Sequence, residues 1–201
     1  MQRTAVHILL FSLGLTASAC ALAEGWVPVR DVEGVAVEAR QTDSGYHEHR
    51  GEAAVCAEMG ALEDFVADTS RFADWIPYTR SARLLDSSGS AFVYYVRSTT
   101  PWPLKDRDMV YQITRHPEID EGVHLSVLGL PDYHPEERNV TRIREAAGQW
   151  HLLQEEDEIN VSYQLYVNPG SVPAFAANRR LAAVVGKTLA NLAAQFPCTQ
   201  I

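Results

Sequence analysis

Four consecutive charged residues, Lys105 to Asp108, stand at the end of a proline-rich turn, just where an alternating strand pattern begins. The surrounding segment, Ser98 to Thr114, reads STTPWPLKDRDMVYQIT. A basic side chain on the inner face of a sheet is costly unless it is paired with an acid or contacts a ligand. Two hypotheses therefore follow for Arg107: an ion pair with Asp106 or Asp108 that closes the sheet edge, or contact with a bound ligand.

The other side chains that could do chemistry do not gather into a recognisable site. His47-Glu48-His49 places two imidazoles on one side of a strand, but no third ligand is identifiable, so we expect no metal or other cofactor. We expect these histidines to be solvated at a sheet edge. His124, His151 and Asp108 are candidate acid–base groups, but they are not paired at a recognisable spacing, and the chain has no G-x-S-x-G elbow.

Length and composition indicate one folded domain. The chain has 201 residues, of which 46% are hydrophobic and 21% charged, and it contains no low-complexity tract. Its formal net charge of −9 makes binding to nucleic acid or to an anionic lipid surface by bulk electrostatics unfavourable. We therefore expect no nucleic-acid partner.

Residues 1–23 are predicted to be a secretory signal peptide, which leaves residues 24–201 as the mature domain. An apolar run from Ala5 to Leu15 follows a basic start and precedes a small-residue cleavage site at Ala23-Glu24. This run is shorter than the roughly 20 residues that span a bilayer. We expect an exported protein, periplasmic or secreted; the alternatives are an uncleaved anchor or a lipoprotein anchored at Cys20.

Cys56 and Cys198 are the cysteines that remain after cleavage. In an oxidising compartment they could form a disulfide that closes a long loop and stabilises the fold. The alternative is two unpaired thiols, one of them buried as a small hydrophobic side chain.

Alternation of apolar and polar residues predicts a domain that is mostly antiparallel sheet. A strand over 35–40 and a second from Tyr46 to Glu58 form an opening hairpin, and 61–75 follows with two short helices, the second capped by Asp68 or Thr69 and ended by Pro77. Turn signals then separate a succession of short strands joined by hairpins. These strands are Ser81 to Leu85, Ala91 to Ser98, Asp108 to Arg115, Gly122 to Leu128, Val140 to Ala147, Gln149 to Gln154 and Ile159 to Val167.

The chain closes with a long amphipathic helix, which Pro173 can start and Pro197 ends. Apolar residues recur along it at steps of three and four, so one stripe faces an apolar surface, and its many alanines allow that surface to come close. A long helix after a curved antiparallel sheet is an α+β arrangement in which the sheet grips the helix.

Several short motifs occur in a fixed order from Trp26 to the last helix. They are Trp26 with Gly34-Val35-Ala36-Val37, Arg50-Gly51-Glu52, Asp68 with Trp75-Ile76-Pro77, Pro101-Trp102-Pro103 with Asp106-Arg107-Asp108, Gly148-Gln149-Trp150, and Tyr163 to Asn178. With this set, the chain resembles a START domain, the lipid-transfer branch of the helix-grip superfamily, and its bacterial members most. The resemblance covers essentially the whole mature chain.

The resemblance implies a cavity between the curved sheet and the last helix that holds one hydrophobic molecule, a lipid or sterol, with the preceding helix and the turns as a lid. It also implies a monomer without enzymatic activity that contacts membranes transiently. By the period of two along a strand, Met109, Tyr111 and Ile113 share the face of Arg107. The residues expected to contact the ligand are Arg107, Met109, Tyr111, Trp75, Tyr78, Tyr95, Trp150, Tyr163, Phe175 and Asn178, although an ordinary core position is the alternative for each aromatic.

One departure from the family pattern concerns the partner of Arg107. Family members often place an acid on the preceding strand, but the matching stretch here, VYYVRS, contains no carboxylate and an additional Arg97. Arg107 is then left to Asp106, Asp108 or Glu52, or to an anionic head group of the ligand.

Two further classes of function stay open. The same superfamily contains cyclases and hydrolases, so an enzyme that acts on a hydrophobic substrate is the alternative to a carrier. An interaction module with a collapsed cavity is the third, and it predicts no pocket between the sheet and the last helix.

Overall fold

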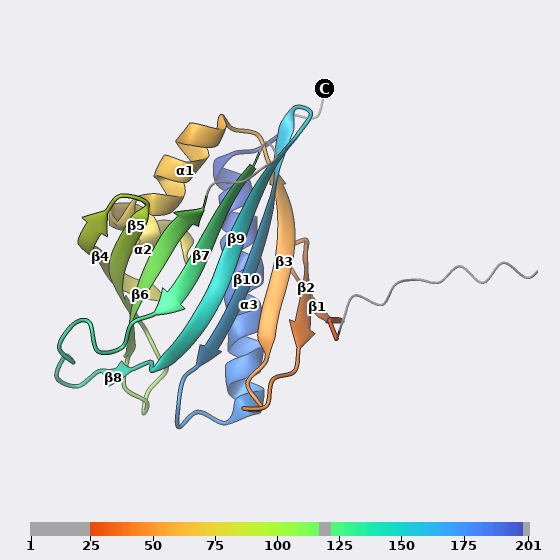
Figure 1. Ribbon diagram of the computed structural model, residues 1–201. Coiled ribbons are helices and arrows are strands. Elements are labelled where there is room, and N and C mark those ends of the chain that lie inside the picture. Colours follow the sequence, from red (N-terminus) through yellow and green to blue (C-terminus); the bar gives the residue numbers. More distant parts are fainter. Residues whose placement is uncertain (1–24, 117–121, 199–201) are drawn as a thin grey trace, which may run out of the picture.

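The computed structural model describes residues 25–116 and 122–198. They form one strongly curved antiparallel sheet, and the long helix α3 (Ala174–Gln195) packs along its inner face, as Figure 1 shows. This is the helix-grip α+β fold that was expected. Within these ranges, no helix is long and apolar enough to cross a membrane. The predicted signal peptide (1–23), its cleavage site and Cys20 lie outside the described residues.

The described part of the sheet has ten strands, and its topology decides where a cavity can form. Their order is β1-β2-β3-β10-β9-β7-β6-β5-β4, with the short β8 paired in parallel to β6. Helix α3 packs on β1, β2, β3 and β10. The inner faces of the other strands therefore lie beside the helix, where a cavity can form. The strands are β1 (Val27–Val32), β2 (Val35–Arg40), β3 (Glu48–Val55), β4 (Thr79–Ser88), β5 (Ala91–Ser98), β6 (Arg107–His116), β7 (Gly122–Gly129), β8 (Thr141–Arg142), β9 (Glu145–Glu155) and β10 (Glu158–Asn168).

The opening hairpin starts one strand earlier than expected. β1 precedes the predicted strand over 35–40, and the two are joined by Glu33 and Gly34, whose φ angles of 56° and 88° are those of a tight hairpin turn. In β1 only Val32 is buried, because this strand forms the edge of the sheet. A strand with one buried residue has no alternating pattern to detect.

The two predicted strands Val140 to Ala147 and Gln149 to Gln154 are in fact the two-residue β8 and the long β9, which runs through Gly148 without a break. A Cβ atom at Gly148 would lie 2.5 Å from the carbonyl oxygen of Gln164 on the neighbouring strand. The glycine therefore allows close pairing of β9 with β10 and does not end a strand.

Short helices cover one end of the sheet, as predicted. They are α1 (Met59–Ala67), the 3-10 turn η1 (Thr69–Arg71) and α2 (Phe72–Trp75). The carboxylate of Asp68 accepts a hydrogen bond from the backbone N–H of Ser70, which is the predicted cap. Leu62, Phe65 and Trp75 are buried and join the core.

Helix α3 is held against the sheet by close packing and by a covalent bond. A Cβ atom at Gly186 would lie 2.5 Å from the Val32 Cβ atom, so only glycine allows this approach to β1. Beyond the helix, Cys198 forms a disulfide with Cys56, with 4.9 Å between their Cα atoms. The alternative of two free thiols is wrong, and the C-terminal end of α3 is pinned to the end of β3.

Candidate functional site

A cavity of about 480 Å³ lies between α3 and the inner face of the sheet. This volume falls within the range of about 300–1,000 Å³ that is usual for small-molecule sites. The interaction-module hypothesis predicted that no such pocket would exist. The residues that line the cavity come from α1, α2, α3, β4, β5, β6, β7, β9 and β10, and from the loops at one end of the sheet.

The walls of the cavity are largely aromatic and aliphatic. The rings of Trp150 and Tyr163 stack with centroids 3.8 Å apart, and Trp75 lies 6.3 Å from Trp150. Most of the residues that the sequence suggested as ligand contacts line this cavity; ligand contact itself stays a prediction. They are Arg107, Met109, Tyr111, Trp75, Tyr78, Trp150 and Tyr163, and Ile113 shares the face of Arg107 as the period of two required.

Tyr95, Phe175 and Asn178 lie elsewhere and are corrections. Tyr95 points to the outer face of the sheet, because its neighbour Tyr94 takes the inner face and successive strand residues alternate. Phe175 is 80% exposed on the first turn of α3. Asn178 donates to the Gly45 carbonyl and accepts from the backbone N–H of His47, which fixes α3 to the β2–β3 loop.

Neutral polar groups occur deep in the cavity. The Nε1–H of Trp75 is buried without a hydrogen-bond partner among the described residues. Burial raises the pKa of Tyr111 and of Tyr163, so both phenols stay protonated at neutral pH. These groups can donate hydrogen bonds to a ligand, but they carry no charge.

Arg107 lies at the other end of the cavity and is only 7% exposed. Its Nε–H donates to the Pro169 carbonyl at 3.2 Å, and Nη1 donates to the Lys105 carbonyl at 3.4 Å. Burial lowers the pKa of Arg107 from its usual value. Within the described part of the chain, no carboxylate forms an ion pair with this guanidinium, so the ion-pair hypothesis for Arg107 is wrong.

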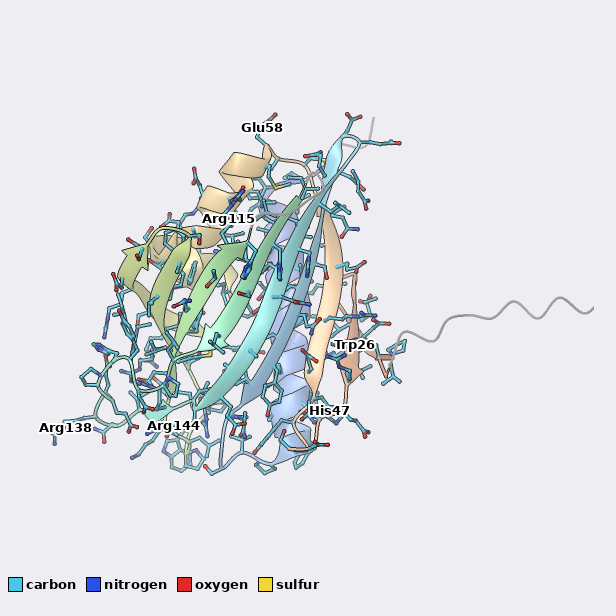
Figure 2. All side chains as sticks on the ribbon, in the orientation of Figure 1. Trp26, His47, Glu58, Arg115, Arg138 and Arg144 are labelled. Atoms are coloured by element: carbon cyan, nitrogen blue, oxygen red, sulfur yellow. A yellow bond between two sulfur atoms is a disulfide. The ribbon has the colours of Figure 1, made fainter. Side chains whose placement is uncertain are left out.

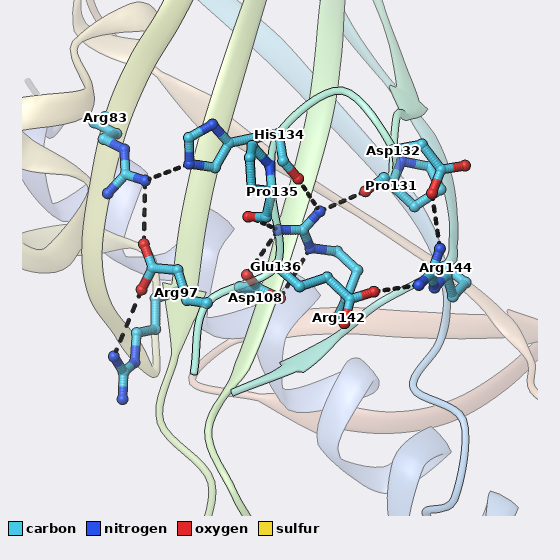
Figure 3. Close-up of polar contacts among 11 residues, drawn as sticks. Arg83, Arg97, Asp108, Pro131, Asp132, His134, Pro135, Glu136, Arg142 and Arg144 are labelled. Carbon is cyan, nitrogen blue, oxygen red and sulfur yellow. Dashed lines mark hydrogen bonds and ion pairs between the residues drawn. The ribbon is translucent and has the colours of Figure 1, made fainter. Parts of the chain in front are cut away.

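The acid that follows Arg107 is held by a different arginine on the outer face of the sheet. Asp108 accepts bonds from Arg142 Nε and Nη2, both at 3.0 Å, and both side chains are buried. Arg142 also donates to the carbonyls of Pro131, His134 and Pro135 (Figure 3). Asp108 points to the opposite face from Arg107 because they are neighbours on β6.

The acid that precedes Arg107 is also engaged elsewhere. Asp106 pairs with Arg97 Nη2 at 2.9 Å and with Arg80 Nε at 3.0 Å, and it accepts the backbone N–H of Thr100. The additional Arg97 that marked the departure from the family pattern is therefore the partner of Asp106.

A second arginine in the cavity, Arg180 on α3, was missed by sequence reasoning. Its Nη2 donates to the Thr99 carbonyl, and its guanidinium lies over the Tyr78 ring, 4.0 Å from the centroid. Burial lowers the pKa of Arg180, the phenol of Tyr78 raises it, and the charge of Arg107 lowers it further. The signal that could have identified Arg180 was helical spacing, because it lies three residues after Ala177 and four before Val184, and both of these residues line the cavity.

The histidines do not form the expected solvated edge. His49 is 2% exposed because β3 is an inner strand between β2 and β10, and burial lowers its pKa to about 4. His124 and His151 are cross-strand partners, with ring centroids 4.4 Å apart. Neither they nor Asp108 lines the cavity, so the three candidate acid–base groups do not converge on it.

Potential metal ligands converge at one place in the described residues, Cys56, Glu158 and Cys198. Both sulfur atoms are in the disulfide, so they are not available as thiolates. This cluster does not fit a metal site.

Comparisons with known proteins show which chains and structures this chain resembles. No family model matches the chain. An uncharacterized protein of Pseudomonas aeruginosa is 30% identical over 161 residues, which are 79% of this chain and 80% of the relative. The crystal structure of a STAR-related lipid transfer protein from Xanthomonas axonopodis has 30% identity and a TM-score of 0.79, covering 86% of this chain and 98% of that one. Human StAR-related lipid transfer protein 5 shares the fold, at 16% identity and a TM-score of 0.72, with 85% of each chain covered.

Proposed function

This chain belongs to the family of StAR-related lipid-transfer (START) domains, and from that premise we propose that it binds one hydrophobic molecule in the cavity and carries it through an aqueous compartment. The observation that carries the proposal is the largely apolar and aromatic cavity between α3 and the sheet. Every 100 Å² or so of ligand hydrocarbon removed from water contributes about 2.5 kcal/mol, so a long or polycyclic ligand gains useful affinity with few polar contacts. The proposed cargo is a lipid or sterol, and the proposed role is binding and transfer without catalysis.

Native mass spectrometry of the protein, purified from its own envelope without detergent, tests this proposal. We expect one hydrophobic molecule per chain. The variant Ala177→Trp puts a large ring on the cavity-facing side of α3 and is expected to lose most of that bound mass. Ala194→Trp, at an exposed position of the same helix, is the matched control and is expected to keep it.

Wild-type protein that carries no added mass and takes up no lipid from vesicles would contradict carriage. Turnover of a polyketide or ester panel by the same preparation would instead support the enzyme alternative. The intact mass also tests the proposed export, since the cleaved chain is expected to begin at Glu24. The Cys56–Cys198 disulfide supports export, because disulfides persist in oxidising compartments.

We further propose that the cavity exchanges its ligand with a membrane at the end where Arg107 lies. The β5–β6 loop and the β10–α3 connection lie together at this end of the molecule (Figure 1). Trp102 in the first is 92% exposed, and Phe175, just after the second, is 80% exposed. Because the chain is acidic overall, apolar side chains rather than charge are the proposed membrane contacts.

Trp102→Ser is expected to slow lipid transfer between neutral vesicles by about tenfold or more, because inserting one indole contributes over 1.4 kcal/mol of apolar burial. The affinity for a short-chain, water-soluble lipid is expected to change less than about threefold, since the indole lies at the rim. Trp26→Ser, on the outer face near β1 (Figure 2), is the control for loss of a tryptophan. Equal slowing by both substitutions would argue against a contact localised at the rim.

A further inference from the structure

Two guanidinium groups from separate elements face the same end of the cavity. Arg107 comes from the first residue of β6 and Arg180 from the second turn of α3. The charge of Arg107 is close enough to lower the pKa of Arg180, although no hydrogen bond joins the two side chains. A largely apolar cavity thus holds two like charges at one end, an arrangement that is costly unless an anion compensates them.

The donors of both groups are mostly unused. A guanidinium has five N–H donors. The hydrogen bonds among the described residues engage two nitrogens of Arg107 and one of Arg180, all of them with backbone carbonyls. Backbone carbonyls position a guanidinium without neutralising it, so donors and charge are both left for a ligand.

The acids near this end of the cavity are committed elsewhere. Asp106 is bound by Arg80 and Arg97, and Asp108 is bound by Arg142 on the other face of the sheet. Across 25–116 and 122–198, no carboxylate forms an ion pair with Arg107 or Arg180. Compensation for the two charges must therefore come from outside the described protein.

We propose that Arg107 and Arg180 together select ligands with an anionic head group, a carboxylate or a phosphate, at the end of the hydrocarbon. This inference rests on the proposed function and names the chemical class of its cargo. Paired guanidinium groups suit such head groups because each presents a planar fork of donors that matches two oxygens. A neutral sterol or a cationic amphiphile would leave both charges uncompensated.

The geometry also orients the ligand. Tyr111 lies four residues after Arg107 on the same strand, roughly 13 Å further into the cavity at the usual rise of a strand. Between and around them the wall is formed by side chains such as Met109 and Val167. The head group then lies at the end of the cavity where Arg107 is, which we call the mouth, and the hydrocarbon extends toward Trp75 and Trp150. A ligand that enters tail first reaches this orientation.

Three probes with twelve carbon atoms in a straight chain test the proposal: dodecyl phosphate, dodecanoate and 1-dodecanol, titrated calorimetrically below their aggregation concentrations. Wild-type protein is expected to bind the two anions about tenfold or more tightly than the alcohol, because each charge-assisted bond is worth about that factor. Arg180→Gln is expected to remove most of this preference. Arg179→Gln, an exposed arginine beside it, is the matched control.

The outcomes separate this inference from the function on which it rests. Equal affinity of wild-type protein for all three probes would overturn the head-group inference and leave a hydrophobic carrier. Binding of none of them would contradict the carrier function and the inference with it. A preference for only one of the two anions supports the inference and identifies the head group. If Arg180→Gln does not fold, Arg180→Met replaces it, and the wild-type comparison still decides.

Discussion

Replacement of Arg142 by methionine is expected to lower the free energy of unfolding by about 4 kcal/mol, because it leaves the buried carboxylate of Asp108 without its partner. Both side chains are 1% exposed, and the pair is bidentate at 3.0 Å. The substitution also removes the donors that hold the carbonyls of Pro131, His134 and Pro135, which fix the loop before β8 against the sheet (Figure 3). Urea unfolding followed by circular dichroism measures the loss.

Arg144 provides a matched control two residues away. It pairs with Asp132 and Glu136, but it is exposed, with 57% of its side chain open to solvent. Such surface pairs contribute at most about 1 kcal/mol, so Arg144→Met is expected to unfold at nearly the wild-type urea concentration. Similar losses for the two methionine variants would show that burial of the Asp108–Arg142 pair is not what stabilises this loop.

Asp108→Leu combined with Arg142→Leu extends the same experiment. Removing both charges avoids the uncompensated carboxylate, so the double variant is expected to be more stable than Arg142→Met even though it has lost the whole pair. The pair matters for the cavity as well. Because Asp108 lies on the outer face and is paired there with Arg142, it does not neutralise Arg107 on the inner face.

Local patterns predicted much of the fold. Alternation located most strands of the meander, prolines marked both ends of α3, and Asp68 was identified as a cap, because each of these signals depends on nearby residues only. The predicted start of the hairpin was wrong because it omitted β1, an edge strand with a single buried residue. The predicted break near Gly148 failed because that glycine serves a close approach of β10, which a one-strand pattern does not reveal.

The prediction of site residues failed where it depended on which face of a strand a side chain occupies, or on an ion-pair partner far away in the sequence. Tyr94 and Tyr95 are adjacent, so only one can lie on the inner face of the sheet, and the aromatic composition of the stretch does not say which. The partner of Asp108 lies 34 residues further along the chain, and no local rule connects it to Arg142. Arg180 was missed because the apolar stripe of α3 pointed to Phe175 and Asn178, which do not line the cavity although Ala176 and Ala177 between them do.

The Arg107 hypotheses show the same limit in another form. The sequence raised two alternatives, an acidic partner or a ligand, but it could not exclude the first. Excluding the ion pair required the positions of Arg80, Arg97 and Arg142, which together occupy both neighbouring acids. Arg107 has no acidic partner because arginines from three other segments pair with the two neighbouring acids.

Loss of the disulfide is the second large effect we expect. Cys56→Ser with Cys198→Ser is expected to lower the free energy of unfolding by about 4 kcal/mol, since the bond closes a loop with a sequence separation of 142 residues and restricts the unfolded chain strongly. Thermal unfolding of the double variant, compared with wild-type protein with and without reductant, measures this. Reductant is expected to lower the melting temperature of the wild type to that of the variant and to leave the variant unchanged.

The same variant also tests how the carrier opens. Two bonds fix the C-terminal end of α3: the disulfide, and the hydrogen bond from the Cys56 N–H to the Phe196 carbonyl. The mouth of the cavity is at the other end of the helix, with Arg180 and the β10–α3 connection. If the helix moves only at the mouth during exchange, the double serine variant in its folded state should release a bound dodecyl probe at the wild-type rate. Release that is about tenfold faster would mean that the pinned end also controls access, because freeing it would then have opened a second way into the cavity.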